Sequence, residues 1–507
     1  MSRVATGGRL TMSRVAPLGR LVRIAGAVAG PAIAGLTLGL MLPRGPMTSW
    51  QSLGALALAL VTGLVTGWLL QSRWAALLAP VVLAAVFEVT RLGAEGPTVD
   101  AIQLDGIYGI AALVAGRGFD GLVILLPLVV GTLWGAARTR PRREVSGRAR
   151  VGLAVRRTGL GVATAVVAVL TLGIVRPAGT EPILDAAGEP VAGSVAELVT
   201  LRVGGTDQTM MIRGHDADAP VLLFLEGGPG GTAIGALRYA GGALEEQFVV
   251  ATWDQRGTGK SASAREPVED LTVERAVADT IEVTEYLVDR FDEEGVYVVG
   301  SSWGTTLGVL AVQQRPDLFR AYVGAGQMVD QYETDLLMYA ESLDYARRAG
   351  DSGFERQLLA IGPPPYTDPL DYPVALSSNP QWQDFTPGED HEWRASYPVS
   401  LFVAEYTLTE QVRSAAALMD TFAVLYPQLA EVDFRRTVPR LEVPVYLVEG
   451  AFEATGRSTL AVEWFEMLSA PSKELVVFEH GGHTPHLDDP GTFADLMAGV
   501  VEETYRL

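Results

Sequence analysis

The 507-residue chain contains no cysteine and only five histidines. The absence of cysteine excludes disulfide bonds, a thiolate nucleophile and cysteine-ligated metal sites. Three of the histidines, His480, His483 and His486, lie close together, so few side chains are available as a catalytic base. Because the histidines and carboxylates of interest have other roles, as argued below, we expect no metal ion and no organic cofactor.

Lysine and acidic residues are scarce in the first third of the chain. Residues 1–176 hold 18 arginines, no lysine and 6 acidic residues, a net charge of +12. Residues 177–507 hold 21 basic and 53 acidic residues, a net charge of −32, so the overall value of −20 describes neither part. An acidic surface repels polyanions, and we therefore expect no nucleic-acid partner. The excess charge of the second part is interpreted as a solvated surface.

Charged residues are nearly absent from five apolar runs, at 22–42, 52–70, 74–90, 121–137 and 158–175. Each run has 17 to 21 residues and at most one internal charge, and about 20 apolar residues cross the hydrocarbon core of a bilayer. Residues 1–176 are therefore predicted to form an α-helical transmembrane domain of about five helices, with the lipid bilayer as partner. A weaker stretch at 101–116, interrupted by Asp105, is interpreted as an interfacial or re-entrant segment.

Arginines gather before the first apolar run and between the last two runs, over 138–157. Basic loops remain in the cytoplasm, so five crossings place the chain after Arg176 on the outer side. We predict a multi-pass protein of the cell membrane with an extracytoplasmic C-terminal part. Glu88, near the outer end of its run, is interpreted as an interfacial residue.

Short β-type runs alternate with helical patterns after a polar linker at 177–194. Two runs, 199–203 and 210–213, are predicted to form a hairpin, and six more follow at 221–225, 248–253, 296–300, 321–324, 445–448 and 474–478. Amphipathic helices between the runs, such as 273–290, indicate a mostly parallel sheet covered on both faces. Ligands bind beyond the carboxyl ends of the strands in such sheets.

The sequence Gly300-Ser301-Ser302-Trp303-Gly304 is a G-x-S-x-G motif between a predicted strand and a predicted helix. A sharp turn there lifts the Ser302 hydroxyl above the sheet, and the helix N-terminus directs backbone N–H groups at a developing oxyanion. We predict Ser302 as a nucleophile, whereas Ser301 faces elsewhere.

A glycine-rich loop, 226–231, follows the strand predicted at 221–225. Because Pro229 has no N–H to donate, the amides of Gly228 and Trp303 are the predicted oxyanion hole. We interpret the loop as a binding site for a substrate carbonyl group rather than as a plain glycine turn.

His483 follows the last predicted strand, where this kind of sheet carries its general base. His480 and His486 are the alternatives. The orienting carboxylate is predicted to be Glu453, after the strand at 445–448, with Asp330 as the alternative acid after the strand at 321–324.

Three motifs in this order resemble the proline iminopeptidase family of α/β-hydrolase-fold serine peptidases, over about 195–505. Residues 227–230 are similar to its H-G-G-P-G loop, 254–261 to its D-Q-R-G-x-G-x-S element, and 300–304 to its G-x-S-W-G elbow. The resemblance implies release of an N-terminal residue, often proline, through an acyl-enzyme. It also implies a core at 195–329 and 439–507 and a helical cap at 330–438, with four aromatic residues available to line a pocket: Tyr366, Trp382, Phe385 and Trp393.

Two residues depart from the family pattern. Glu226 stands where the family has histidine, and Glu453 stands where it has aspartate. The resemblance implies that carboxylates of the cap bind the free amine of the substrate. Glu405 and Glu333 are available for this role. The predicted substrate-binding residues are Glu226, Gly227 and Glu405.

These features predict a membrane-anchored aminopeptidase that acts on short peptides. An esterase or amidase of the same fold, acting on a small ester or amide, is the nearest alternative. A membrane transporter or sensor with a ligand-binding hydrolase-like half is a third possibility, and the intact serine, histidine and glycine loop argue against it.

Overall fold

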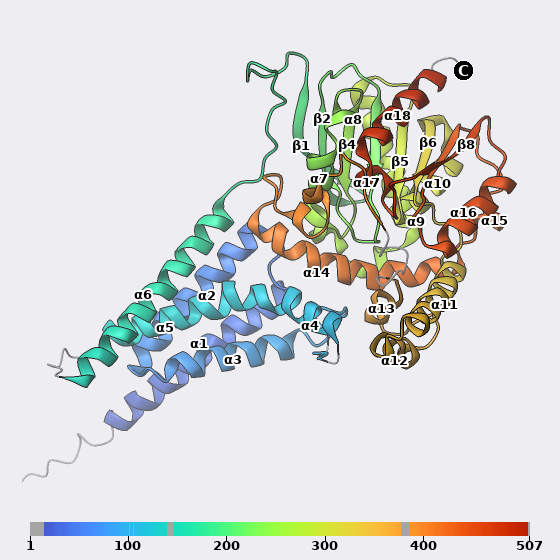
Figure 1. The fold of residues 1–507 in the computed structure, drawn as a ribbon. Coiled ribbons are helices and arrows are strands. Elements are labelled where there is room, and N and C mark those ends of the chain that lie inside the picture. The colour runs from blue at the N-terminus through green and yellow to red at the C-terminus, as the bar shows by residue number, and fades with distance from the viewer. Residues whose placement is uncertain (1–14, 101, 105, 139–146, 377–384, 505–507) are drawn as a thin grey trace, which may run out of the picture. The chain divides into compact units, whose positions relative to one another are not determined.

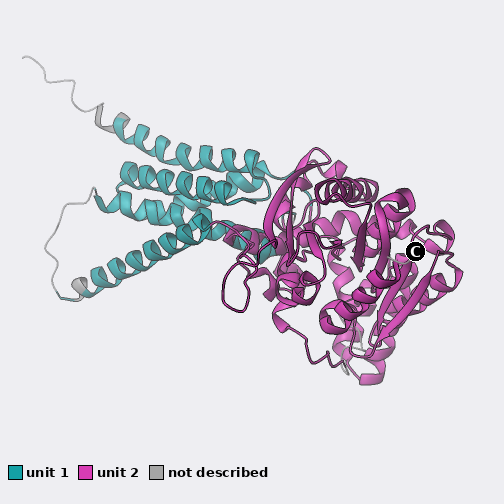
Figure 2. Ribbon diagram, turned by 90° about the horizontal axis from the view of Figure 1, so that it is seen from above, with its two compact units in different colours: residues 1–95, 99–102, 113–176 teal, residues 96–98, 103–112, 177–507 magenta. Residues whose placement is uncertain are grey.

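The computed structural model describes all residues except 1–14, 101, 105, 139–146, 377–384 and 505–507 (Figure 1). The chain divides into two compact units, of residues 1–95, 99–102 and 113–176, and of residues 96–98, 103–112 and 177–507 (Figure 2). Asp105, Trp382 and the arginines within 1–14 and 139–146 lie outside the described residues.

The N-terminal part is helical, as the apolar runs predict. Its helices are α1 (Val15–Met41), α2 (Ser49–Leu70), α3 (Ala75–Thr90), α4 (Ile107–Leu113), α5 (Leu126–Arg138) and α6 (Arg148–Val175). Among the described residues, four helices are long and apolar enough to cross a membrane: Gly19–Met41, Ser49–Leu70, Ile107–Arg138 and Val151–Val175.

One expectation about these helices is corrected, and the number of crossings stays a prediction. The run at 74–90 forms α3, an apolar helix of 16 residues that is shorter than these four, so the expected five crossings require α3 to cross as well. The stretch at 101–116 is not a separate interfacial segment from Ile107 onward. Two π-helical stretches, Val114–Gly118 and Gly121–Leu125, join α4 to α5 in one long helix.

Glycines bring α2 and α5 into close contact. A Cβ atom on Gly67 would lie 2.0 Å from the carbonyl oxygen of Thr132, and one on Gly131 would lie 2.3 Å from that of Leu60. Small residues at facing positions allow two helices to approach this closely in a bilayer, where packing replaces the hydrophobic effect between helices. No larger residue fits at these positions without moving the backbone.

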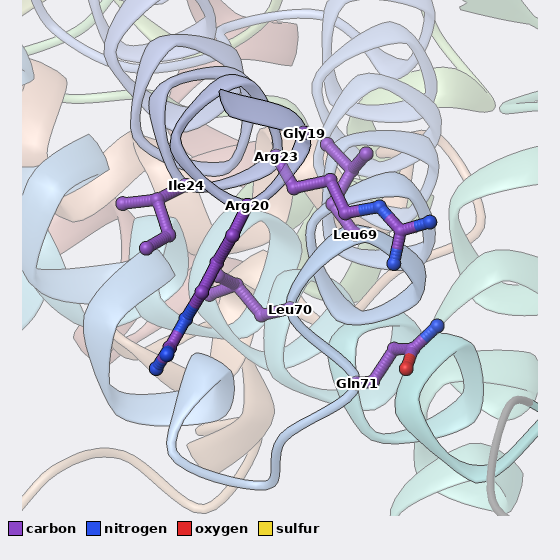
Figure 3. Close-up of a pocket in the computed structure, with 7 residues that line it drawn as sticks. All are labelled: Gly19, Arg20, Arg23, Ile24, Leu69, Leu70 and Gln71. Atoms are coloured by element: carbon purple, nitrogen blue, oxygen red, sulfur yellow. The ribbon is translucent and has the colours of Figure 1, made fainter. Parts of the chain in front are cut away.

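A cavity of about 540 Å³ lies between one end of α1 and the end of α2. Figure 3 shows Arg23 and Gln71 on one side of it and Arg20 and Ile24 on the other. None of the predicted site residues lines this cavity.

The second unit contains an eight-stranded, mostly parallel sheet, which confirms the predicted α/β-hydrolase fold. Its strands are β1 (Val195–Val203), β2 (Thr206–Gly214), β3 (Val221–Leu225), β4 (Val249–Asp254), β5 (Val296–Ser301), β6 (Phe319–Ala325), β7 (Val445–Gly450) and β8 (Lys473–Phe478). The order is β1-β2-β4-β3-β5-β6-β7-β8. The pairs β1–β2 and β2–β4 are antiparallel, and every later pair is parallel.

The central strands are apolar on both faces because helices cover both faces of the sheet. In β3, Leu223 and Leu225 join one core cluster, whereas Leu222 and Phe224 join the other. The first cluster is covered by α9 (Val273–Phe291), α10 (Trp303–Gln314) and α16 (Thr455–Met467), and the second by α7 (Ile234–Ala240), α8 (Gly242–Glu245) and α18 (Pro490–Thr504).

A helical insertion separates β6 from β7. It contains α11 (Gln331–Ala349), α12 (Ser352–Ile361), α13 (Tyr372–Leu376), α14 (Leu408–Leu425) and α15 (Phe434–Thr437), and we call it the cap. The predicted linker at 177–194 packs on the sheet unit, because Nη1 of Arg213 donates to Thr180 Oγ1 at 2.7 Å and to the Glu181 carbonyl at 2.6 Å.

Candidate active site

Ser302 lies on a strained turn between β5 and α10. Its φ and ψ are 52° and −119°, a combination that a residue with a side chain seldom adopts. Small neighbours make the turn possible, since a Cβ atom on Gly304 would lie 1.9 Å from the Leu225 carbonyl oxygen. The Ser302 N–H donates to the Ala325 carbonyl at 3.1 Å, which fixes the turn at the carboxyl end of the sheet.

Glu453 and His483 are joined by a hydrogen bond. Nδ1 of His483 lies 2.5 Å from Oε2 of Glu453, and because a carboxylate only accepts, Nδ1 carries the hydrogen. The other ring nitrogen, Nε2, is then left as an acceptor. Oε1 of Glu453 accepts from the Ala454 N–H at 2.6 Å and from Arg457 Nη1 at 3.3 Å.

The surroundings of Glu453 keep its carboxylate ionised. Burial alone would raise its pKa, but the charges and hydrogen bonds of His483 and Arg457 and the Ala454 N–H lower the pKa to about 2. A permanent anion at this position orients the imidazole and stabilises its protonated form.

The end of β6 connects the serine to the histidine. Ala325 accepts the Ser302 N–H, and the next residue, Gly326, lies against the imidazole of His483. A Cβ atom on Gly326 would lie 3.0 Å from Nδ1 of that ring, and φ is +62°, so both space and conformation require glycine. Within the described residues, the Ser302 hydroxyl makes no hydrogen bond. Such bonds are often long or absent before substrate binds.

The glycine-rich loop lies over Ser302. A Cβ atom on Gly227 would lie 2.9 Å from the Ser302 Cβ atom, so glycine is required for this approach. The Trp303 amide begins α10, and the first N–H groups of a helix have no acceptor within that helix. This amide and that of Gly228 are the two candidate donors to an oxyanion.

Gln255 ties the loop to the turn. Its side chain accepts from Trp303 Nε1 at 2.9 Å and donates to the Glu226 carbonyl at 2.9 Å. Gln255 belongs to the Asp254–Ser261 element, for which the sequence suggested no role beyond the resemblance. The site therefore contains a residue that holds both sides of the candidate oxyanion hole.

A second carboxyl group lies behind Glu453. Glu449, in β7, is buried and accepts the Gln327 N–H at 2.9 Å. Burial, followed by the nearby charge of Glu453, raises the pKa of Glu449 well above its usual range. The surroundings therefore shift the pKa values of the two glutamates in opposite directions, that of Glu449 upward and that of Glu453 downward.

Asp330, the alternative acid, has a different environment. It caps the start of α11 by accepting the Glu333 N–H at 2.8 Å, and it forms an ion pair with Arg435 at 3.1 Å. The structure thus brings Glu453, and not Asp330, to the imidazole of His483.

The two cap carboxylates considered for an amine already have cationic partners. Glu405 is buried and pairs with Arg238 at 3.0 Å, and Glu333 pairs with Arg435 at 2.6 Å. Neither presents a free carboxylate, which the sequence could not indicate because both arginines are remote along the chain.

The two alternative histidines have other environments. His486 is buried against Phe224 and Phe493, with ring centroids 5.1 and 5.9 Å away. Burial lowers the pKa of His486 to about 3, so it is a neutral packing residue. His480 is exposed, and its Nδ1 lies 3.3 Å from the Thr386 carbonyl.

The aromatic residues proposed for a pocket lie in unlike places. Phe385 packs against Phe452 at 5.7 Å and lies beside Gly482, next to His483. Tyr366 packs on Tyr372 inside the cap, and Trp393 is exposed. Of the described members of this set, Phe385 is therefore the one at the candidate site.

Sequence reasoning missed Arg457, Gln255, Gly326 and Glu449. Arg457, in the first turn of α16, follows Glu453 by four positions and pairs with it from just inside the helix, whereas Glu453 precedes the helix. Gln255, Gly326 and Glu449 act through tertiary contacts, which a local sequence pattern cannot indicate.

The sheet order and the strand–turn–helix serine define the α/β-hydrolase class. The sequence profile described as alpha/beta hydrolase fold matches residues 220–490, and the chain belongs to this family. A "Probable aminopeptidase YbaC" of Bacillus subtilis (strain 168) is 31% identical over 312 residues, covering 61% of this chain and 97% of that protein.

Two further relatives carry related names. A "Probable proline iminopeptidase" of Leptolyngbya boryana is 24% identical over 304 residues, covering 58% of this chain and 88% of that protein. The crystal structure of a proline iminopeptidase of Mycobacterium smegmatis is 18% identical, covers 61% of this chain and 98% of that chain, and has a TM-score of 0.43. The profile match and the Bacillus subtilis relative confirm the resemblance found from the motifs at the level of the family.

Proposed function

We propose that this protein is a membrane-anchored serine aminopeptidase that releases the N-terminal residue of short peptides through an acyl-enzyme. The observation that carries the proposal is the His483–Glu453 pair at 2.5 Å, beside a serine on a strained turn. Only a few reaction classes use this arrangement, and acyl transfer is the principal one.

The geometry supports a two-step reaction. Nε2 of His483 takes the proton of the Ser302 hydroxyl as Oγ attacks the carbonyl carbon of the substrate. The Gly228 and Trp303 amides stabilise the resulting oxyanion, each contributing about 3–4 kcal/mol. His483 returns the proton to the leaving amine, and water then releases the acyl group by the same steps.

Glu226 is the proposed ligand for the substrate α-ammonium group. Its Oε1 accepts the Gly227 N–H at 2.8 Å, and among the described residues it has no cationic partner. Burial raises the pKa of Glu226, although the Gly227 hydrogen bond lowers it, so a bound ammonium would stabilise the ionised form. The ammonium of an N-terminal residue is two bonds from the scissile carbonyl, which suits a carboxylate next to the oxyanion loop.

We further propose that the hydrolase unit lies outside the cytoplasm, an orientation in which α3 crosses the bilayer together with the four longer helices. The arginine-rich N-terminus and the arginines between α5 and α6 favour the cytoplasmic side, and charge bias of this kind sets orientation in membranes. An acidic, cysteine-free hydrolase unit is compatible with that location.

The test uses the full-length chain in detergent or lipid nanodiscs. Free-amine aminoacyl arylamides, proline included, are assayed beside N-acetylated analogues and simple esters, with Ser302→Ala as the control. The proposal expects hydrolysis of free-amine substrates that is lost in Ser302→Ala. Hydrolysis of esters without any arylamide cleavage would favour the esterase alternative.

Glu226→Gln separates amine recognition from chemistry. Loss of a charge-assisted hydrogen bond of about 1.5–3 kcal/mol predicts a drop of about 10- to 100-fold in kcat/KM for free-amine substrates. Hydrolysis of a neutral ester should be unchanged, and an equal drop on both substrates would contradict this role.

A further inference from the structure

A short segment between two membrane helices belongs to the hydrolase unit. Residues 96–98 and 103–112 lie between α3 and α5 in the chain, yet they group with residues 177–507 (Figure 2). We call these two pieces the strap. The strap is covalently continuous with apolar helices at both ends, so its packing on the cap needs an explanation.

The strap is anchored at Thr98. This residue is 2% exposed, and its N–H and hydroxyl donate to the two carboxylate oxygens of Asp420 at 3.1 and 2.8 Å. Asp420 lies in α14, is itself buried, and pairs with Arg265 at 3.1 Å. Two hydrogen bonds to the same buried carboxylate, 322 positions away in the chain, attach the strap to α14 in one defined position.

Two further contacts hold the strap to other parts of the cap. Nε2 of Gln103 donates to Asp368 Oδ2 at 3.0 Å, and the Tyr108 hydroxyl donates to the Pro373 carbonyl at 3.3 Å. Asp368 and Pro373 lie between α12 and α14. These contacts are independent of Asp420.

The residues beside Asp420 touch the loops of the candidate active site. A Cβ atom on Gly230 would lie 2.9 Å from the Leu418 carbonyl oxygen and 3.1 Å from the Thr421 Cβ atom, so α14 rests directly on the glycine-rich loop. The Thr421 hydroxyl donates to the Gly257 carbonyl at 2.8 Å. Gln255, in the same loop as Gly257, holds the Glu226 carbonyl and the Trp303 side chain.

We propose that Thr98 is a positioning residue of the hydrolase: through Asp420 it holds α14 against the loops at 226–231 and 255–261, and so fixes the oxyanion hole. The strap thereby makes the region between α3 and α5 a working part of the active-site support. Oxyanion donors act mainly in the transition state. Loosening them lowers kcat and leaves KM nearly unchanged.

The strap also bears on the topology of the chain. The strap packs on the same unit as residues 177–507, so the connection between α3 and α4 lies on the same side of the membrane as the hydrolase. Two candidate spans, Ile107–Arg138 and Val151–Val175, lie between Thr98 and residue 177, and two crossings likewise return the chain to the same side.

The test compares Thr98→Val, which removes the hydroxyl at constant shape, with Thr98→Ser, which keeps it, in the full-length chain. Amide hydrogen exchange is followed at 226–231 and 255–261. Loss of a hydrogen bond to a buried charge predicts exchange in both loops that is about tenfold faster in Thr98→Val, with wild-type exchange in Thr98→Ser. Thr98→Ala serves the same purpose if Thr98→Val does not fold.

Gln103→Leu is the matched control, because it breaks a strap contact that does not involve α14. It should leave exchange in the two loops unchanged. Wild-type exchange in these loops in Thr98→Val, or equal acceleration in Thr98→Val and Gln103→Leu, would overturn the proposal.

The second readout rests on the proposed function. With a free-amine arylamide, Thr98→Val should show a kcat about tenfold lower at nearly constant KM. A wild-type protein that cleaves no substrate would defeat the proposed function, and the exchange comparison would still decide the role of Thr98. An unchanged kcat in Thr98→Val, with an active wild type, would overturn the strap proposal alone.

Discussion

Replacement of Glu453 by glutamine is the most informative change to the candidate triad. The carboxylate now receives three hydrogen bonds, from His483 Nδ1 at 2.5 Å, Ala454 N–H at 2.6 Å and Arg457 Nη1 at 3.3 Å. Glutamine keeps the size but loses the charge, and its amide nitrogen can donate to Nδ1. The imidazole then adopts the tautomer with hydrogen on Nε2, which cannot accept the proton of Ser302.

The expected cost follows from this change of tautomer. Loss of the orienting carboxylate in a serine triad lowers kcat by about 10⁴-fold, which corresponds to roughly 5.5 kcal/mol in the activation barrier. Glu453→Asp retains the charge on a shorter side chain, so a smaller loss is expected. Because His483 and Arg457 hold the pKa of Glu453 near 2, the carboxylate is ionised at every practical assay pH.

The assay is steady-state hydrolysis by the full-length protein, with Asp330→Asn as the comparison. Asp330 caps α11 and pairs with Arg435, so its loss should lower stability more than kcat. A kcat for Glu453→Gln within tenfold of the wild type would refute the assignment. A collapse of kcat in Asp330→Asn alone would transfer the role to Asp330.

Three other predictions concern the membrane helices, pH and topology. Gly67→Ala should lower the thermal unfolding midpoint at a cost of about 1–3 kcal/mol, because its Cβ atom would lie 2.0 Å from a carbonyl oxygen. Gly54→Ala, on the same helix, places its Cβ atom with nothing within 4 Å and should leave the midpoint unchanged. Equal midpoints for the two variants would contradict the packing of α2 on α5. Burial raises the pKa of Asp254 to about 7, although the hydrogen bond from the Lys260 N–H opposes this shift. Between about pH 4 and pH 7 the folded state therefore keeps a proton on Asp254 that the unfolded state has lost, and the free energy of unfolding falls as pH rises through this window. The stability of Asp254→Asn relative to wild type should therefore increase across it, and parallel unfolding curves would contradict the assignment. Since the chain has no cysteine, Glu294→Cys and Arg73→Cys each introduce a single thiol. A membrane-impermeant maleimide should label the cysteine at 294 in intact cells and the cysteine at 73 only after permeabilisation. The reverse pattern would contradict the orientation.

The sheet and its order along the chain were predictable because buried parallel strands are short apolar runs. The run at 221–225 coincides with β3, and the others match their strands to within a few residues. Ser302 and His483 follow the ends of such strands, so the G-x-S-x-G motif and the place of the histidine after the last strand suggested them. The hydrogen bond between His483 and Glu453 needed the structure, since 30 positions separate the two residues.

Other features could not be predicted from local patterns. Asp105 interrupts the apolar run at 101–116 and suggested an interfacial segment, whereas the helix begins at Ile107 and continues to Arg138. The sequence suggested Glu405 as an available cap carboxylate, whereas the structure pairs it with Arg238. The bond between Thr98 and Asp420 joins two residues of the second unit that lie 322 positions apart, and neither periodicity nor composition marks it.

Trapping the covalent adduct on the enzyme shows which side chain is the nucleophile, and we expect it to be Ser302. The full-length protein is incubated with a slowly deacylating ester or a fluorophosphonate, digested, and the adduct is located by mass spectrometry. We expect a single adduct on the peptide containing Ser302, formed slowly in His483→Ala and Glu453→Gln and absent in Ser302→Ala. An adduct on another residue, or none in a folded protein that still hydrolyses substrate, would contradict it.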